Sequence, residues 1–158
     1  MSELVVGIDP GCSGAIVALT ASGGVFSVLP MPTLRLGNKT RVNGSHAGFW
    51  LQEQGEIKHA YLEHVGAMPG QGTASMFSFG HSVGVIEGLL MGIGIPYTLV
   101  TPQAWKKSAG LIGTDKDASR SRAIQLYPSL RELDKKAKGQ AIADAILIAR
   151  HGMGIKCN

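Results

Sequence analysis

The chain has 158 residues, 44% of them hydrophobic and 16% charged, which excludes a disordered protein and allows one domain over residues 1–158 with a buried core. Its two cysteines, Cys12 and Cys157, are far apart. A disulfide framework and a cysteine zinc site are therefore excluded, and a reducing, cytoplasmic setting is expected. We expect no segment long and apolar enough to span a membrane and no export signal, and therefore no membrane partner.

Five strands are expected from short apolar runs bounded by Gly and Pro. They cover residues 3–9, 15–20, 24–30, 59–63 and 96–101, and the first three form an antiparallel meander. Residues 31–45 are expected to form a polar loop with three basic residues. Helices are expected over 47–54, 73–91, 115–126 and 139–150, and another begins at Pro102 with Thr101 as its cap. This order predicts a mixed sheet flanked by helices in an α/β domain.

The net charge of +4 is unevenly distributed along the chain. Residues 101–138 contain nine Lys and Arg residues against four acids, whereas the remainder is close to neutral. A basic cluster of this kind favours one surface that binds a phosphate backbone. The alternative, an ordinary solvated surface with spare lysines, remains open at this point.

Three acids stand where burial is expected. Asp9 and Glu63 each end a predicted strand, the first within "VVGIDPGCSGAIVAL", and Asp144 interrupts the apolar helix "AIADAILIA". A buried carboxylate needs a partner, yet no basic side chain lies three or four residues from Asp144. If the strands that end at Asp9 and Glu63 are neighbours, their carboxylates lie side by side and need cations between them. Carboxylate oxygens suit Mg²⁺, so these acids indicate a metal site, and the glycines after Asp9 would let a substrate approach. A structural carboxylate is the alternative for Asp144.

These features coincide with a resemblance to a known family. The stretches "GIDPGCSGAIVAL", "YLEHVGAMPGQGTASMFSFG", "GIPYTLVTPQAWKK", "GTDKDASRSRAIQLYP" and "ADAILIA" together cover most of the chain in the right order. Through them the sequence resembles a RuvC-type Holliday junction resolvase in a compact phage or prophage form. The resemblance implies the ribonuclease H-like fold, with a central mixed five-stranded sheet, and a magnesium-dependent endonuclease that nicks four-way DNA junctions.

The resemblance also implies roles for individual residues. Asp9, Glu63 and Asp144 match the family's catalytic metal ligands, which would hold two Mg²⁺ ions that Mn²⁺ can replace. Lys116 would neutralise charge that builds on the scissile phosphate. The expected DNA contacts are Lys106, Lys107, Lys116, Arg120 and, in the loop where family members present an aromatic wedge, Met68.

The sequence departs from the family at one metal position. Family members commonly carry an acid or a histidine about one turn before the helix aspartate, where this chain has Gln140 and Ala141. Gln140 could coordinate a metal weakly or hold a water, but it supplies no charge. Two alternatives to a resolvase therefore stay in view: a broader branched-DNA or flap nuclease, and, because of Ala141, a non-catalytic junction-binding protein.

A homodimer is expected because two symmetric cuts require two active sites. The glycine-rich helix "FGHSVGVIEGLLMG" is a candidate dimer face, since small residues allow another helix to approach closely. The alternative, in which this helix packs on its own sheet, has equal weight.

Overall fold

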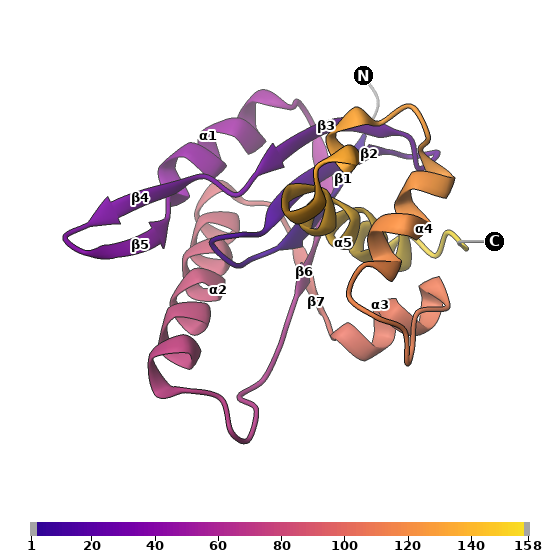
Figure 1. Cartoon of the computed structure of the whole chain (residues 1–158). Coiled ribbons are helices and arrows are strands. Elements are labelled where there is room, and N and C mark those ends of the chain that lie inside the picture. Colours follow the sequence, from indigo (N-terminus) through magenta and orange to yellow (C-terminus); the bar gives the residue numbers. More distant parts are fainter. Residues whose placement is uncertain (1–2, 157–158) are drawn as a thin grey trace.

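A computed structural model describes residues 3–156 of the chain, so Cys157 lies outside the described residues. Five strands form one sheet in the order β3-β2-β1-β6-β7 (Figure 1). Their bounds are β1 Leu4–Asp9, β2 Ala15–Thr20, β3 Val25–Pro30, β6 Ile57–Glu63 and β7 Tyr97–Val100. The pairs β1–β2 and β2–β3 are antiparallel, whereas β6 runs parallel to both β1 and β7. The predicted mixed five-stranded sheet is therefore confirmed.

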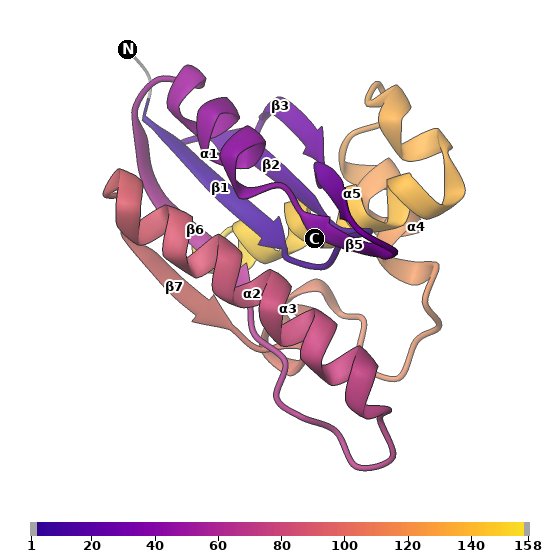
Figure 2. The same ribbon diagram turned by 90° about the vertical axis from the view of Figure 1, so that its left-hand side faces the viewer.

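Helices cover both faces of this sheet, as the order of elements predicted (Figure 2). They are α1 Gly44–Glu53, α2 Thr73–Ile93, α3 Pro102–Ala109, α4 Ala118–Leu126 and α5 Lys136–Gly152, with a short 3-10 helix at Arg131–Asp134. Helix α3 begins as expected, because Thr101 Oγ1 accepts a hydrogen bond from the Ala104 backbone N–H and Pro102 occupies the first turn.

The expectation of a polar loop over residues 31–45 is wrong. Two strands, β4 Thr33–Leu36 and β5 Lys39–Val42, pair there in an antiparallel hairpin that extends away from the main sheet (Figure 1). Leu36 lies opposite Lys39, so the turn has two residues, and Gly37 adopts the positive φ of 64° that tight hairpin turns require. The segment was missed because its strands are short and polar, with little apolar alternation to mark them.

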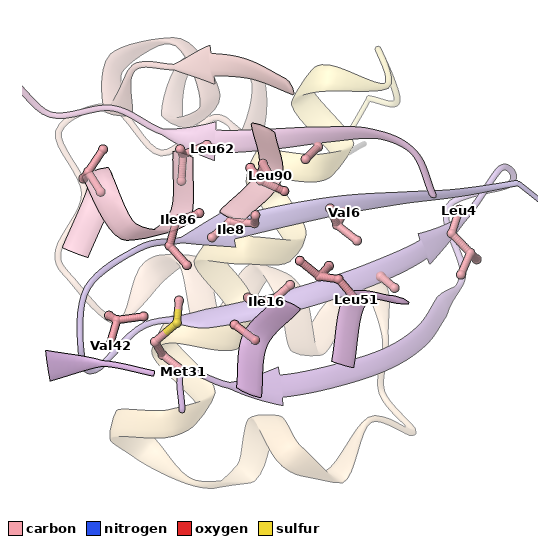
Figure 3. Close-up of a cluster of buried hydrophobic side chains, with 14 residues drawn as sticks. Leu4, Val6, Ile8, Ile16, Met31, Val42, Leu51, Leu62, Ile86 and Leu90 are labelled. Carbon is pink, nitrogen blue, oxygen red and sulfur yellow. The ribbon is translucent and has the colours of Figure 1, made fainter. Parts of the chain in front are cut away.

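Strand β1 sends alternate side chains to opposite faces of the sheet. Ile8 joins Leu4 and Val6 in the core beneath α1 and α2, where it packs with Ile86 and Leu90 of α2 (Figure 3). Gly7 faces α5, and a Cβ at this position would lie 1.9 Å from the carbonyl oxygen of Ala145. The missing side chain thus lets α5 lie directly on β1. Because Asp9 is two residues beyond Gly7, its side chain points to the same face as α5.

Helix α2 is 21 residues long with a mean hydropathy of 1.4, so by length and composition alone it could cross a membrane. Our expectation that no segment has these properties is wrong for this helix. One face packs on the sheet through Val83, Ile86 and Leu90. The opposite face carries glycines at a spacing of four, at which a Cβ would meet no described atom within 4 Å; they are Gly80, Gly84, Gly88 and Gly92. Helix α2 therefore packs on its own sheet with one face and leaves a face of small residues uncovered.

Candidate active site

Three chain segments bring three acids to one edge of the sheet. The parallel pairing of β1 with β6 sets Ile8 beside Leu62, so Asp9 and Glu63 follow at the carboxyl ends of adjacent strands. Asp144 comes from α5, next to the residue whose carbonyl touches Gly7. The prediction that the strands ending at Asp9 and Glu63 are neighbours is confirmed. One edge of the sheet therefore carries a cluster of acids from distant parts of the sequence.

The acids are hard to ionise together. The pKa of Asp9 is raised from 3.8 to about 8, chiefly by burial and then by the nearby carboxylates of Glu63 and Asp144, while a hydrogen bond from the Gly11 backbone amide lowers it. Burial also raises the pKa of Glu63, and it is the main cause that brings the pKa of Asp144 from 3.8 to about 6. A cation among these groups would remove both the repulsion and the desolvation penalty.

The glycines after Asp9 serve the backbone more than an approaching substrate. A Cβ at Gly14 would lie 2.0 Å from the carbonyl oxygen of Asp9, so only glycine fits this tight turn. The Gly14 backbone N–H donates to the carbonyl of Gly11 at 2.8 Å, which closes the turn. Gly11 in turn presents its amide to the Asp9 carboxylate. The turn therefore positions Asp9, which the sequence reasoning had not anticipated.

Glu63 is held by an aromatic side chain of α3. The Trp105 indole Nε1 donates a hydrogen bond of 3.1 Å to Glu63 Oε1, and the Trp105 side chain is almost wholly buried, with 2% of its surface exposed. The next residue, Lys106, places its Nζ 5.5 Å from the centre of the Trp105 ring. The Lys106 charge lowers the pKa of Glu63 and of Asp144, in opposition to burial. Lys106 is therefore the cation that acts electrostatically on two of the three acids.

Asp144 is held by a polar pair from α4 and α5. The buried Ser119 hydroxyl donates to Asp144 Oδ1 at 2.6 Å, and Gln140 Nε2 donates to the same oxygen at 3.1 Å. Gln140 Nε2 also contacts Ser119 Oγ. Both hydrogen bonds to the Asp144 carboxylate go to Oδ1, and neither uses Oδ2. These contacts make Gln140 an orienting partner of Asp144, and they use only its Nε2, so its expected role as a weak metal ligand through Oε1 stays a prediction.

The donor set suits a hard divalent cation, since three carboxylates converge with raised pKa values and oxygen ligands are those that Mg²⁺ prefers. Among residues 3–156, however, no three His, Cys, Asp or Glu side chains lie together closely enough to hold one ion by themselves. An ion at this edge would therefore need water or substrate oxygens to complete its coordination, as Mg²⁺ commonly does.

The predicted DNA-contact residues fall into different settings. Lys116 and Lys106 line a recess of about 370 Å³ together with Asp144, so both lie near one of the three acids. Lys107 is exposed on α3. Met68 is 60% exposed, in the loop after Glu63.

Arg120 has a different environment from the lysines. Its guanidinium bonds to Asp117 at 3.0 Å and to the Leu133 carbonyl at 2.9 Å, with 19% of the side chain exposed. These contacts join α4 to the short 3-10 helix. They give Arg120 a structural role inside the domain, and the DNA contact expected for it stays a prediction.

Sequence reasoning missed two residues of the site, Trp105 and Ser119. Trp105 lies 42 residues from Glu63, and Ser119 lies 25 residues from Asp144. No spacing within a helix or strand connects such pairs, since they meet only when α3 and α4 dock on α5. The one available signal was indirect: a carboxylate inside an apolar helix requires a remote polar partner.

The chain is similar to known proteins in sequence and in fold. No family model matches the chain. Over 97 residues, or 61% of its length, the chain is 33% identical to the chloroplastic Holliday junction resolvase MOC1 of Chlamydomonas reinhardtii. The aligned region is 11% of that protein, so the chain spans only a small part of its relative.

Solved structures identify the fold. The structure matches Thermus thermophilus RuvC with a TM-score of 0.58 at 14% identity, over 97% of this chain and 98% of that one. It also matches T. thermophilus RuvC in complex with a Holliday junction substrate, with a TM-score of 0.60 at 12% identity, over 94% of this chain and 91% of that one. The domain therefore has the ribonuclease H-like fold of RuvC. The resemblance to RuvC and to Holliday junction resolvases seen in the sequence is confirmed by the fold and by the partial match to MOC1, whereas the phage or prophage form stays a prediction.

Proposed function

We propose that this protein is a metal-dependent endonuclease that resolves four-way DNA junctions by paired symmetric nicks. The observation that carries the proposal is the convergence of Asp9, Glu63 and Asp144, with raised pKa values, beside two lysines at the carboxyl edge of the sheet. The homology to a protein named as a Holliday junction resolvase supports the choice of substrate.

The three carboxylates would hold divalent cations, Mg²⁺ with Mn²⁺ as a substitute. Asp9 is influenced by both Glu63 and Asp144, so it is the ligand that two ions would share. Bound there, the ions would lower the pKa of a water and stabilise charge on the leaving oxygen of the phosphodiester. Trp105 and the pair formed by Ser119 and Gln140 would keep one oxygen of each outer carboxylate occupied and so fix its orientation.

Two lysines would act on the substrate phosphate. Lys116 and Lys106 line the recess beside Asp144, and each can place a positive charge near a bound phosphodiester. Lys106 already lowers the pKa of two acids, so it also favours the ionised ligands that a metal needs. We assign charge neutralisation in the transition state to Lys116 and ligand ionisation to Lys106.

We propose further that the active form is a homodimer. A four-way junction has two-fold symmetry, and two matched nicks need two copies of the site. The face of α2 with glycines at 80, 84, 88 and 92 would meet its copy, because its small residues allow two helix backbones to approach closely. Met91, 64% exposed on the same helix, would add apolar contact at this interface.

The test is cleavage of a mobile four-way junction in Mg²⁺ or Mn²⁺, compared with a fork, a flap and plain duplex of matched sequence. We expect nicks at symmetry-related positions of the junction and none with the D9N variant, which should still bind. Equal cleavage of forks and flaps would instead favour a broader branched-DNA nuclease. Unchanged turnover by D9N would contradict the assignment of Asp9 to the metal site.

A second function is favoured by one specific observation. No three acids or histidines in the described chain are grouped to hold an ion, and Ala141 stands where family members carry a ligand. A protein with this site could bind junctions without cutting them. Tight junction binding with no product in either Mg²⁺ or Mn²⁺ would establish that alternative.

A further inference from the structure

A second surface lies beside the acid cluster, between the β4–β5 hairpin and the first turns of α2. It is an open groove of about 720 Å³. Lys39 and Arg41 of β5 form one wall, and Thr73 and Phe77 of α2 form the other. Both elements are visible side by side at the end of the sheet where β1 terminates (Figure 2).

The turn after β1 links the groove to the candidate active site along the chain. Cys12, three residues beyond Asp9, also lines the groove. Its Sγ lies 3.9 Å from the Thr40 carbonyl of the hairpin and 3.8 Å from Ser82 Oγ of α2. The segment that positions Asp9 therefore touches both walls.

The electrostatic character of the groove is basic. Residues 10–52 contain no Asp or Glu, and their three cations all belong to the hairpin. Lys39 lies opposite Leu36, and Arg41 lies opposite Leu34, so both cations share one face of the hairpin. Arg35 pairs with Thr40 and points to the other face. Two positive charges thus face the groove with no acid among its lining residues.

An exposed aromatic ring completes the surface. Phe77 is 64% exposed, which is costly for so large an apolar side chain. The Arg41 guanidinium carbon lies 6.0 Å from the centre of the Phe77 ring. The His81 ring lies 6.4 Å away at a tilt of 39°, and the exposed part of the Phe77 ring can stack on a planar ligand. Basic side chains beside an exposed aromatic ring are the combination that binds the phosphates and bases of single-stranded nucleic acid.

We propose that this hairpin groove binds an unpaired stretch of DNA strand as it leaves the active site, with a base stacked on Phe77 and phosphates bound by Lys39 and Arg41. Fully paired duplex offers no free base face to the ring, so the groove prefers the opened strands at a branch point. The inference rests on the proposed function for its substrate class. It adds a strand-binding surface separate from the lysines of α3 and the following loop.

The test uses four single variants of the full chain. K39Q and F77A alter the groove, and each has a matched control. R35Q removes the same charge from the other face of the same hairpin. F49A removes a comparably exposed ring, 61% against 64%, from α1. Binding of a four-way junction, an oligo-dT strand and a fully paired duplex is followed by fluorescence anisotropy without divalent cations, over a range of salt concentrations. Thermal unfolding checks that every variant is folded.

We expect F77A to weaken binding of oligo-dT and of the junction about tenfold, with little effect on the duplex. K39Q should reduce the slope of log affinity against log salt by roughly 0.7, the value for one phosphate contact on a single strand. R35Q and F49A should each change affinity less than twofold. Equal loss on all three DNAs, or no difference between the groove variants and their controls, would overturn the proposal.

The outcome is separable from that of the cleavage assay. If the protein cuts junctions normally while K39Q and F77A behave like their controls, the groove proposal fails and the nuclease assignment stands. If the groove variants lose oligo-dT binding but no protein cuts a junction, the groove stands and the nuclease assignment fails.

Discussion

Ser119 Oγ donates a hydrogen bond of 2.6 Å to Asp144 Oδ1, which joins the first turn of α4 to the middle of α5 at the edge of the acid cluster. The hydroxyl is buried, and the bond lowers the pKa of Asp144 against the larger effect of burial. A serine without charge therefore helps to keep the Asp144 carboxylate ionised. The bond also fixes the orientation of that carboxylate.

The S119A variant tests this relationship. Loss of the donor should raise the pKa of Asp144, so the acid limb of the pH–rate profile for junction cleavage should move to higher pH. A hydrogen bond to a charged group contributes ~1.5 kcal/mol, which corresponds to about one pKa unit, so we expect roughly a tenfold lower rate below pH 6 and about a twofold loss at pH 7. S121A, on the exposed side of the same helix, is the control. A uniform loss of rate at all pH values would contradict this role.

The W105F variant tests the second carboxylate contact. Phenylalanine keeps most of the buried ring but removes the indole N–H that donates to Glu63 Oε1. We expect the Mn²⁺ concentration for half-maximal cleavage to rise roughly tenfold, as for other partners of metal ligands. The matched control is W50F, which changes the other tryptophan of the chain on the opposite face of the sheet. Equal metal dependence in both variants would remove Trp105 from the site.

The sequence could predict the sheet and the three acids because both depend on local patterns. Alternating apolar residues mark β1, and Asp9 and Glu63 stand where such runs stop. Asp144 stood out because its helix is apolar on all sides. Helix α5 is the most buried of the described helices, and Gly7 allows its close contact with β1. The register of adjacent parallel strands then placed the acids together.

The partners of the acids could not be predicted in this way. Trp105 and Ser119 reach the site through the docking of α3 and α4, which no periodicity within those helices encodes. Gln140 was noticed at the right position, but its role depends on which way its amide points. Arg120 looked like one more surface cation until its bonds to Asp117 and the Leu133 carbonyl were seen. Side-chain direction, more than residue identity, separates these roles.

The raised pKa of Asp9 predicts how the metal-free protein responds to pH. The folded value of about 8 exceeds the ordinary value of 3.8, so between these limits the folded state binds more protons than the unfolded state. The free energy of unfolding should therefore fall as the pH rises from about 4 to about 8. D9N cannot ionise at this position and should show a smaller fall, with a higher Tm than the native chain at pH 8 without divalent ions.

Addition of Mg²⁺ should reverse that order. Only the native chain has the full set of carboxylates, so its Tm should rise while that of D9N changes little. Differential scanning fluorimetry at several pH values measures both effects without reference to cleavage. E132Q, at an exposed acid outside the site, is the control. If D9N and the native chain have the same Tm at pH 8 in the absence of metal, the acids do not repel one another as we infer.

A glycine of the uncovered α2 face tests the dimer. A side chain at Gly84 would meet no described atom within 4 Å of its Cβ, so G84Q should stabilise the monomer by ~0.5–1 kcal/mol through helix propensity alone. The same side chain should keep two α2 helices apart and shift the protein from dimer to monomer in sedimentation velocity. S121Q, at an exposed position of α4, adds the same side chain away from this face and should leave the oligomeric state unchanged. In a junction assay, the G84Q monomer should nick one strand without the second, coupled nick that a dimer makes. An unchanged dimer would exclude this face of α2 from the interface.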